Sequence, residues 1–145
     1  MMSNIEFSYR QEHSPVLGTI HRPIAKVQFR KNDDEWVSEF MYVDSGADFV
    51  LIPYKFGKFL GFEHKKENVH TIQGVNGEVS IVFRVAKMRI GTYVFPVKVA
   101  WSQIEDVPVL LGRLDVFDRF KEMKPRILTP LGIYFKGMFS SKCAA

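Results

Sequence analysis

The sequence predicts a mainly β domain with one or two short helices, because strand-like alternation of apolar and polar residues recurs along the chain. Residues 24–29 and 36–42 alternate in this way on either side of the polar run 31–34, which predicts a hairpin. A second hairpin is expected where Asn76-Gly77 lies between two β-rich arms. Asn-Gly readily supplies the two positive φ angles of a tight hairpin turn.

Further strands are expected toward both ends of the chain. Residues 85–90 and 93–101 predict two strands separated by a Gly-Thr pair, and residues 127–135 can supply a closing strand. Residues 1–17 show no clean period, so they are expected to form either a flexible extension or an added edge strand.

The first short helix is expected after Pro53. Phe56, Phe59 and Leu60 fall at helical spacing, and Gly61 follows where a C-cap glycine is favoured. A second helix is expected from Leu114 onward, where three apolar residues recur at helical spacing, namely Leu114, Phe117 and Phe120. The regions around Gly46 and Gly112 thus share one plan: an apolar strand, a glycine-bearing loop and a short helix.

Length and composition fit one domain. The chain has 145 residues, of which 46% are hydrophobic and 25% are charged, as in ordinary soluble globular proteins. We expect an N-terminal extension at residues 1–20, one domain at 21–137 and a C-terminal tail at 138–145.

Neither a membrane span nor a disulfide is expected. No segment approaches the roughly 18 apolar residues of a membrane span, and the N-terminus lacks a signal-peptide pattern. Cys143 is the only cysteine, so no intrachain disulfide can form. A cytoplasmic location is the default expectation.

The net charge of +4 comes from lysines and arginines scattered through the chain. Only a mild cluster occurs, at Lys55, Lys58, Lys65 and Lys66. Scattered charge favours solubility over a nucleic-acid footprint, although nucleic-acid binding with a steep salt dependence remains a weaker hypothesis.

One polar motif interrupts the apolar run of residues 41–53. Asp44-Ser45-Gly46 places a carboxylate, a hydroxyl and a glycine between β-forming residues. The same three residues also favour an ordinary turn. Apolar residues on both sides instead indicate a loop beside the core, where a carboxylate suggests a function.

In this order, the segments of the chain resemble the retropepsin family, the single-domain aspartic proteases of retroviruses and their relatives. Three pieces over residues 22–135 carry the resemblance: a catalytic loop at 44–48, a flap at 72–79 and a second loop, Leu-Leu-Gly-Arg, at 110–113. Ser45 stands where threonine is commoner, and it keeps the hydroxyl. The resemblance implies an all-β acid-protease barrel with one lobe per chain.

The resemblance also implies a site. Asp44 would be catalytic, and each chain would supply one carboxylate to a homodimer, in which two Asp44 side chains share one proton and activate water. Supporting roles would fall to Ser45, Gly46, Asp48 and Arg113, with Asp48 pairing Arg113. Contacts to a peptide or unfolded protein substrate would come from six residues: Ala47, Gly74, Val75, Asn76, Gly77 and Val109. No metal or other cofactor is expected, because the sequence has no zinc-protease motif and no Cys/His ligand cluster.

Two functions therefore compete. The first is an aspartic endopeptidase that acts as a homodimer, with a flap closing over an extended peptide. The second is a catalytically silent dimerisation or peptide-binding module with the same fold, since one fold often serves different tasks.

Overall fold

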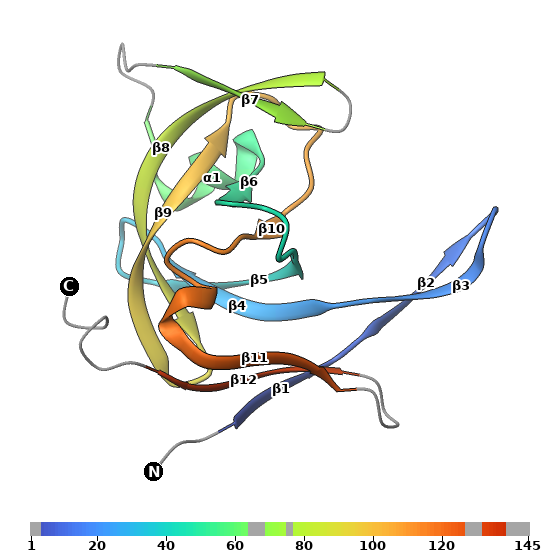
Figure 1. Cartoon of the computed structure of the whole chain (residues 1–145). Coiled ribbons are helices and arrows are strands. Elements are labelled where there is room, and N and C mark those ends of the chain that lie inside the picture. Colours follow the sequence, from blue (N-terminus) through green and yellow to red (C-terminus); the bar gives the residue numbers. More distant parts are fainter. Residues whose placement is uncertain (1–3, 64–68, 75–76, 127–131, 139–145) are drawn as a thin grey trace.

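The structure, a computed structural model, describes residues 4–63, 69–74, 77–126 and 132–138, and only the backbone from residue 121 onward. This part of the chain is mainly β, with one α-helix and one 3₁₀ turn (Figure 1). In chain order the elements are β1 (Asn4–Ser8), β2 (Arg10–Ser14), β3 (Gly18–Arg22), β4 (Ile24–Arg30), β5 (Trp36–Val43), β6 (Val50–Ile52), α1 (Tyr54–Leu60), β7 (His70–Gly74), β8 (Gly77–Ile90), β9 (Tyr93–Ser102), β10 (Leu110–Leu111), η1 (Phe117–Arg119), β11 (Phe120–Arg126) and β12 (Gly132–Met138).

Six of these strands form a mixed barrel. Their hydrogen-bonded order is β4-β5-β10-β6-β9-β8, and pairing of β4 with β8 closes the ring. The short strand β10 runs parallel to β5 and antiparallel to β6. β7 extends the sheet beyond β8. The described arms confirm both predicted hairpins, one in β4–β5 and the other in β7–β8.

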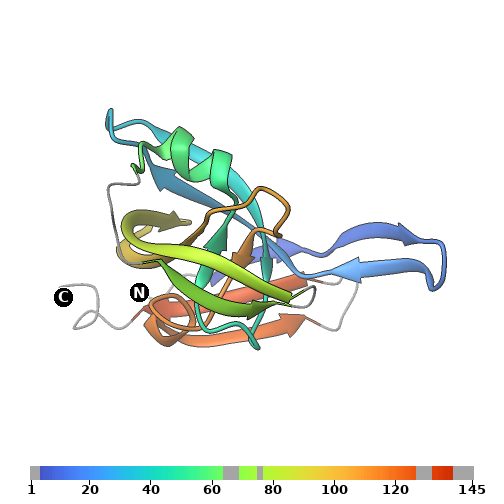
Figure 2. The same ribbon diagram turned by 90° about the horizontal axis from the view of Figure 1, so that it is seen from above.

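Two smaller sheets lie outside the barrel. β1 forms the edge of a three-stranded sheet with β12 and β11. The N-terminus thus supplies an edge strand. The expected closing strand is present as β12, although residues 127–131 of the predicted range lie outside the described residues. β2 and β3 form a two-stranded arm that projects from the body (Figures 1 and 2). The sequence analysis did not anticipate this arm.

The barrel encloses an apolar core. Its largest fully buried side chains include Phe29, Met41, Ile52, Phe95 and Trp101. Residues on β4 alternate between buried and less buried positions, as period-two packing requires. The alternation predicted from the sequence therefore matches the burial of the side chains on β4.

Helix α1 confirms the first predicted helix. Gly61 ends it in the left-handed conformation, with a φ of 103°. Gly57 is needed for close packing, because a Cβ added there would lie 2.1 Å from Trp101 Nε1. Trp101 Nε1 in turn donates a hydrogen bond to the carbonyl of Tyr54 at 3.0 Å. Gly57 has a low helix propensity, but its lack of a Cβ lets α1 pack closely against Trp101.

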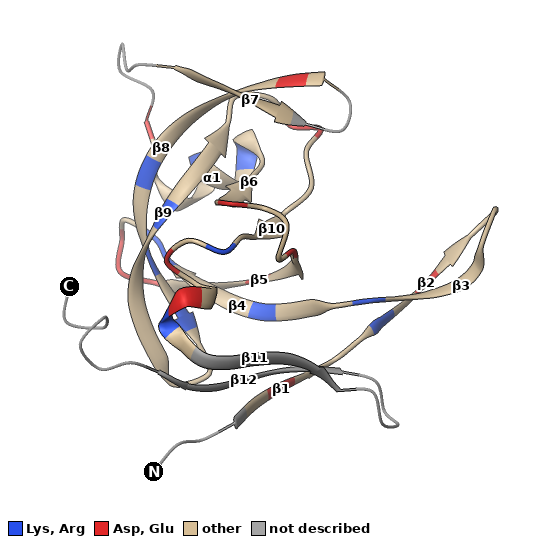
Figure 3. Ribbon diagram, viewed as in Figure 1, with Lys and Arg blue, Asp and Glu red and all other residues tan. Residues whose placement is uncertain are grey.

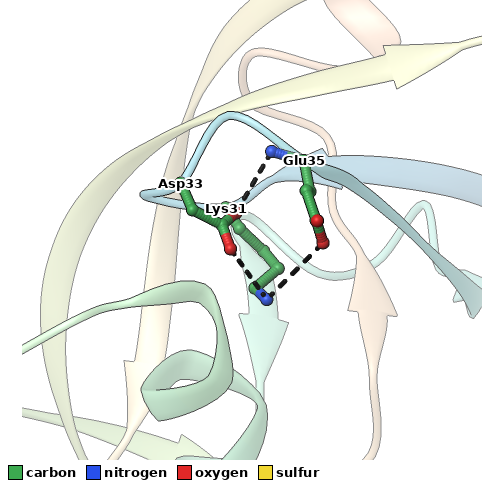
Figure 4. A network of polar contacts seen from close by, with 3 residues as sticks. All are labelled: Lys31, Asp33 and Glu35. Atoms are coloured by element: carbon green, nitrogen blue, oxygen red, sulfur yellow. Dashed lines mark hydrogen bonds and ion pairs between the residues drawn. The ribbon is translucent and has the colours of Figure 1, made fainter.

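The turn between β4 and β5 is held by a small polar network (Figure 4). The backbone N–H of Glu35 donates to Asp33 Oδ1 at 3.2 Å, and Lys31 Nζ lies 3.4 Å from Asp33 Oδ2. The hydrogen bond from Glu35, assisted by Lys31, holds the pKa of Asp33 below its ordinary value. Asn32 N also donates to the carbonyl of Leu60, which ties the turn to α1.

The second predicted helix, from Leu114 onward, is wrong. Only the 3₁₀ turn η1 forms, and Phe120 already belongs to β11. Asp115 has a φ of 67°, a left-handed conformation that interrupts a helix at its start. The buried apolar residues are Val116 and Phe120, whereas Leu114 stays 38% exposed. Helical spacing of apolar residues was therefore misleading here, because pairing with β12 extends the chain instead.

Candidate active site

Asp44 follows β5 directly and begins a tight loop. Its backbone N–H donates to the carbonyl of Leu111 at 3.0 Å, and its Oδ1 accepts from the N–H of Gly46 at 2.9 Å. Ala47 N donates to the carbonyl of Asp44 at 3.2 Å. The backbone of half-buried Asp44 is thus fixed by two hydrogen bonds and its carboxyl by one, while Ser45 and Gly46 are exposed.

The loop after β10 binds the Asp44 loop through its backbone. Arg113 N donates to the carbonyl of Ala47, and Leu114 N donates to the carbonyl of Asp48, both at 2.9 Å. Because β10 also pairs with β5 and β6, it lies between the strand before the Asp44 loop and the strand after it. The two loops therefore form one rigid unit.

Gly112 lies where these loops come closest. A Cβ added at this position would lie 2.2 Å from the carbonyl oxygen of Phe49 and 2.7 Å from its nitrogen. Only glycine fits this close approach of two backbones. In the sequence Gly112 marks only a loop, because its packing role depends on the distant backbone of Phe49.

An ion pair joins the same two loops at the surface. Arg113 Nη2 donates to Asp48 Oδ1 at 3.0 Å. The Arg113 side chain is 53% exposed and that of Asp48 is 64% exposed. The expected contact is present, and its role in a reaction stays a prediction. Exposure to this degree limits what the pair contributes to stability.

The predicted flap corresponds to the β7–β8 hairpin. Gly74 pairs with Gly77 at the closed end, where Gly77 has a φ of 114°. Val75 and Asn76, the predicted tip, lie outside the described residues. In Figure 1, β7 lies toward the top of the view and β5, which leads into Asp44, lies below it. Its contact with a substrate stays a prediction.

Val109 lies beside the strand that leads to Asp44. Its carbonyl accepts a hydrogen bond from Tyr42 N at 2.9 Å, and its side chain is half-buried against the core. The structure thus brings Ala47, Asp48, Val109 and Arg113 around the Asp44 loop, whereas Gly74 and Gly77 belong to the separate hairpin.

An aromatic cluster at this end of the barrel was missed from the sequence. The rings of Phe49 and Phe83 pack edge to face with centroids 4.9 Å apart, and His70 lies 5.2 Å from Phe83. Lys98 Nζ lies 4.3 Å from the centroid of the Phe83 ring. His70, Phe83 and Lys98 lie on the neighbouring strands β7, β8 and β9. Phe49 comes from a segment far from them in the sequence, so no local pattern indicated its contact with Phe83.

Tyr42 links the site strand to the projecting arm. Its hydroxyl donates to Glu12 Oε1 on β2 at 3.2 Å. Burial, followed by this hydrogen bond, raises the pKa of Tyr42 above its ordinary value. The strand that positions Asp44 is therefore also the strand that holds the base of the arm.

Charges around the site do not form a metal centre in the described part of the chain. There, no group of three or more His, Cys, Asp or Glu residues could hold a metal ion. Lys and Arg are spread over several elements, with Asp and Glu between them (Figure 3).

No helix within the described ranges is long and apolar enough to cross a membrane.

The local chemistry is that of one positioned carboxylate. Asp48 is paired with Arg113, whereas Asp44 lies at the start of an exposed loop. A single carboxylate can act as a base or an acid but cannot supply both at once. Acid–base chemistry on one water would need a second group from outside this loop.

Comparison with known proteins identifies the type of fold and the family. The family described as aspartyl protease matches residues 32–113. A retropepsin-like aspartic protease from Rickettsia conorii superposes with a TM-score of 0.60 and 21% identity, covering 92% of this chain and 98% of that chain. The EIAV protease complexed with the inhibitor HBY-793 gives a TM-score of 0.52 and 21% identity, covering 72% and 91% respectively. A search of curated proteins found no matching sequence.

Proposed function

Because the chain belongs to the retropepsin-like aspartyl protease family, we propose that it is an aspartic endopeptidase that acts as a homodimer. The observation that carries the proposal is the position of Asp44. It follows a barrel strand, is fixed by Leu111 and Gly46, and begins a loop whose next two residues are exposed. Such a loop is available to a second copy and to a substrate.

The dimer follows from the number of carboxylates. The sequence contains one Asp-Ser-Gly motif, and its described residues form one barrel. A symmetric dimer, with Asp44 of each protomer at the two-fold axis, supplies the missing group. Ser45 would hydrogen-bond across the axis to brace the two loops, and Gly46 would let the substrate approach the backbone.

The two carboxylates would then share one proton. At a separation of about 3 Å, two unit charges repel by roughly 5 kcal/mol at an effective dielectric constant near 20. The ionised carboxylate takes a proton from water as the water attacks the peptide carbonyl. The protonated carboxylate supports the developing oxyanion. No covalent intermediate is needed.

The surrounding residues would position the loop and the peptide. The Arg113–Asp48 ion pair and the backbone bonds beside it would hold the Asp44 loop in place. The β7–β8 hairpin would close over an extended peptide, add strand-like backbone bonds and exclude water. Ala47 and Val109 would form apolar walls of the substrate site.

The test is cleavage of a peptide library and of an unfolded protein by wild type and by Asp44→Asn, over a pH series from acidic to neutral. We expect cleavage by wild type, inhibition by a pepstatin-like transition-state mimic and loss of cleavage in Asp44→Asn. Asp106→Asn is the matched control, because it makes the same change at an exposed loop carboxylate. It should retain wild-type activity.

Sedimentation must show that Asp44→Asn remains a dimer, so that lost activity reports chemistry rather than assembly. Equal cleavage by wild type and Asp44→Asn would refute the proposal. Peptide binding by wild type without cleavage at any pH would instead favour the silent peptide-binding module.

A further inference from the structure

The β2–β3 arm is not part of the barrel. Its two strands pair with each other and form a sheet of their own. In Figures 1 and 2 the arm extends well beyond the body of the protein. A lone two-stranded hairpin is at best marginally stable in water, so an arm of this kind gains most from a surface to pack against.

The tip of the arm presents two aliphatic side chains. Val16 is 88% exposed and Leu17 is 72% exposed. The tip is nevertheless an ordered turn, because Ser14 Oγ accepts hydrogen bonds from the N–H groups of Val16 and Leu17, and Gly18 takes a φ of 76°. The turn therefore holds an apolar pair outward at the far end of the arm.

The base of the arm is attached to the strand that carries the catalytic loop. Val43 N donates to the carbonyl of Pro23 at 2.8 Å, and Tyr42 donates through its hydroxyl to Glu12. Val43 immediately precedes Asp44. In a dimer in which the two Asp44 side chains meet, the start of the arm would therefore lie next to the partner.

The arm extends toward the side on which the proposed partner would lie. In Figure 1 it extends toward the side on which β5 ends, and the closed end of the β7–β8 hairpin points the same way there and in Figure 2. Five extended residues span roughly 17 Å. A partner whose Asp44 lies within about 3 Å of this one would therefore lie within reach of the outer part of the arm.

We propose that the β2–β3 arm is a clasp for a second copy of this chain, with Val16 and Leu17 buried against the partner. This inference rests on the proposed function, because it places the two-fold axis at Asp44. By symmetry each protomer clasps the other, so a dimer contains two such contacts.

The first test measures the monomer–dimer equilibrium by analytical ultracentrifugation of the full chain. Val16→Ser/Leu17→Ser should raise the dimer dissociation constant at least about tenfold, since burying one aliphatic side chain is worth roughly that factor or more. Val85→Ser is the matched control. It removes another aliphatic side chain, 71% exposed, from β8, and should leave the dissociation constant unchanged.

The second test places a photo-crosslinking benzoylphenylalanine at position 17 and mixes two differently tagged copies. We expect a covalent dimer that contains both tags. Crosslinks only within one chain, or an unchanged dissociation constant in the double variant, would overturn the clasp.

The experiments distinguish failure of the clasp from failure of the protease proposal. If the double variant and wild type dimerise equally and both cleave peptide through Asp44, the clasp is wrong and the protease stands. If the clasp holds, the double variant should lose activity at low protein concentration and recover it at high concentration. A clasped dimer without cleavage would support the arm and refute the protease, and a wild type monomeric at every concentration would overturn both.

Discussion

Gly112→Ala should destabilise the protein by about 3–5 kcal/mol. The added Cβ would lie 2.2 Å from the Phe49 carbonyl oxygen, whereas ordinary contact begins at 3.4 Å. Overpacking of this kind typically costs about 1–3 kcal/mol. Movement of the loops also weakens two backbone hydrogen bonds, from Arg113 to Ala47 and from Leu114 to Asp48, each worth about 1 kcal/mol.

The assay is urea unfolding followed by tryptophan fluorescence and circular dichroism. A loss of this size is a large part of the roughly 5–15 kcal/mol that stabilises a typical domain, so the variant should fold at low temperature and unfold at markedly lower urea. Ordinary surface substitutions change the free energy of unfolding by up to about 0.5 kcal/mol. If Gly112→Ala changed it by no more than that, the inference that the Phe49 backbone leaves no room for a Cβ at position 112 would be refuted.

Gly57→Ala separates stability from site geometry. A Cβ there would also clash, at 2.1 Å from Trp101 Nε1, but this clash lies between α1 and β9. Both variants should therefore lose stability. Under conditions where both are folded, Gly57→Ala should keep wild-type peptide cleavage, whereas Gly112→Ala should lose it because the Asp44 loop has moved. Equal loss of cleavage in the two variants would contradict this account of Gly112.

Two further predictions concern polar contacts. Asp48→Asn and Arg113→Gln should couple by only about 0.2–1 kcal/mol in a double-mutant cycle of unfolding, since both side chains are more than half exposed; a coupling above about 2 kcal/mol would contradict this. The raised pKa of Tyr42 contributes stability that is fully present below its ordinary pKa of 10.0 and is lost as pH rises through the folded pKa. Tyr42→Phe should therefore flatten the alkaline loss of thermal stability, and an identical alkaline profile in the variant would show that Tyr42 is not its source.

Local signals explain what could be predicted. The strand pattern, the β4–β5 hairpin and helix α1 depend on neighbouring residues, and Gly61 does end α1. The Asp-Ser-Gly loop, the hairpin and Leu-Leu-Gly-Arg are each weak motifs, but in this order they resemble the retropepsin family. That resemblance predicted the barrel, and the similarity to a solved retropepsin-like structure confirms it.

Distant contacts explain what could not be predicted. The second helix failed because the conformation of Asp115 and the pairing of β11 with β12 outweigh the helical spacing of three apolar residues. The arm carries little apolar periodicity, since its strands bury no face in the core. The contact between Phe49 and Phe83 joins segments far apart in the sequence, and His70 adds to it from the neighbouring strand β7.

The two glycine loops differ in the side chains that they can hold. Both follow a strand of the barrel, and they meet side by side, but only in the first does a carboxylate directly follow the strand. Asp115 of the second loop instead accepts a hydrogen bond from the backbone N–H of Lys98 at 2.9 Å. In the second loop, Gly112 is buried against the Phe49 backbone, where even a Cβ does not fit. A second aspartate could not be accommodated at Gly112 without separating the loops that hold Asp44. The proposed homodimer would supply the second carboxylate without any change at Gly112.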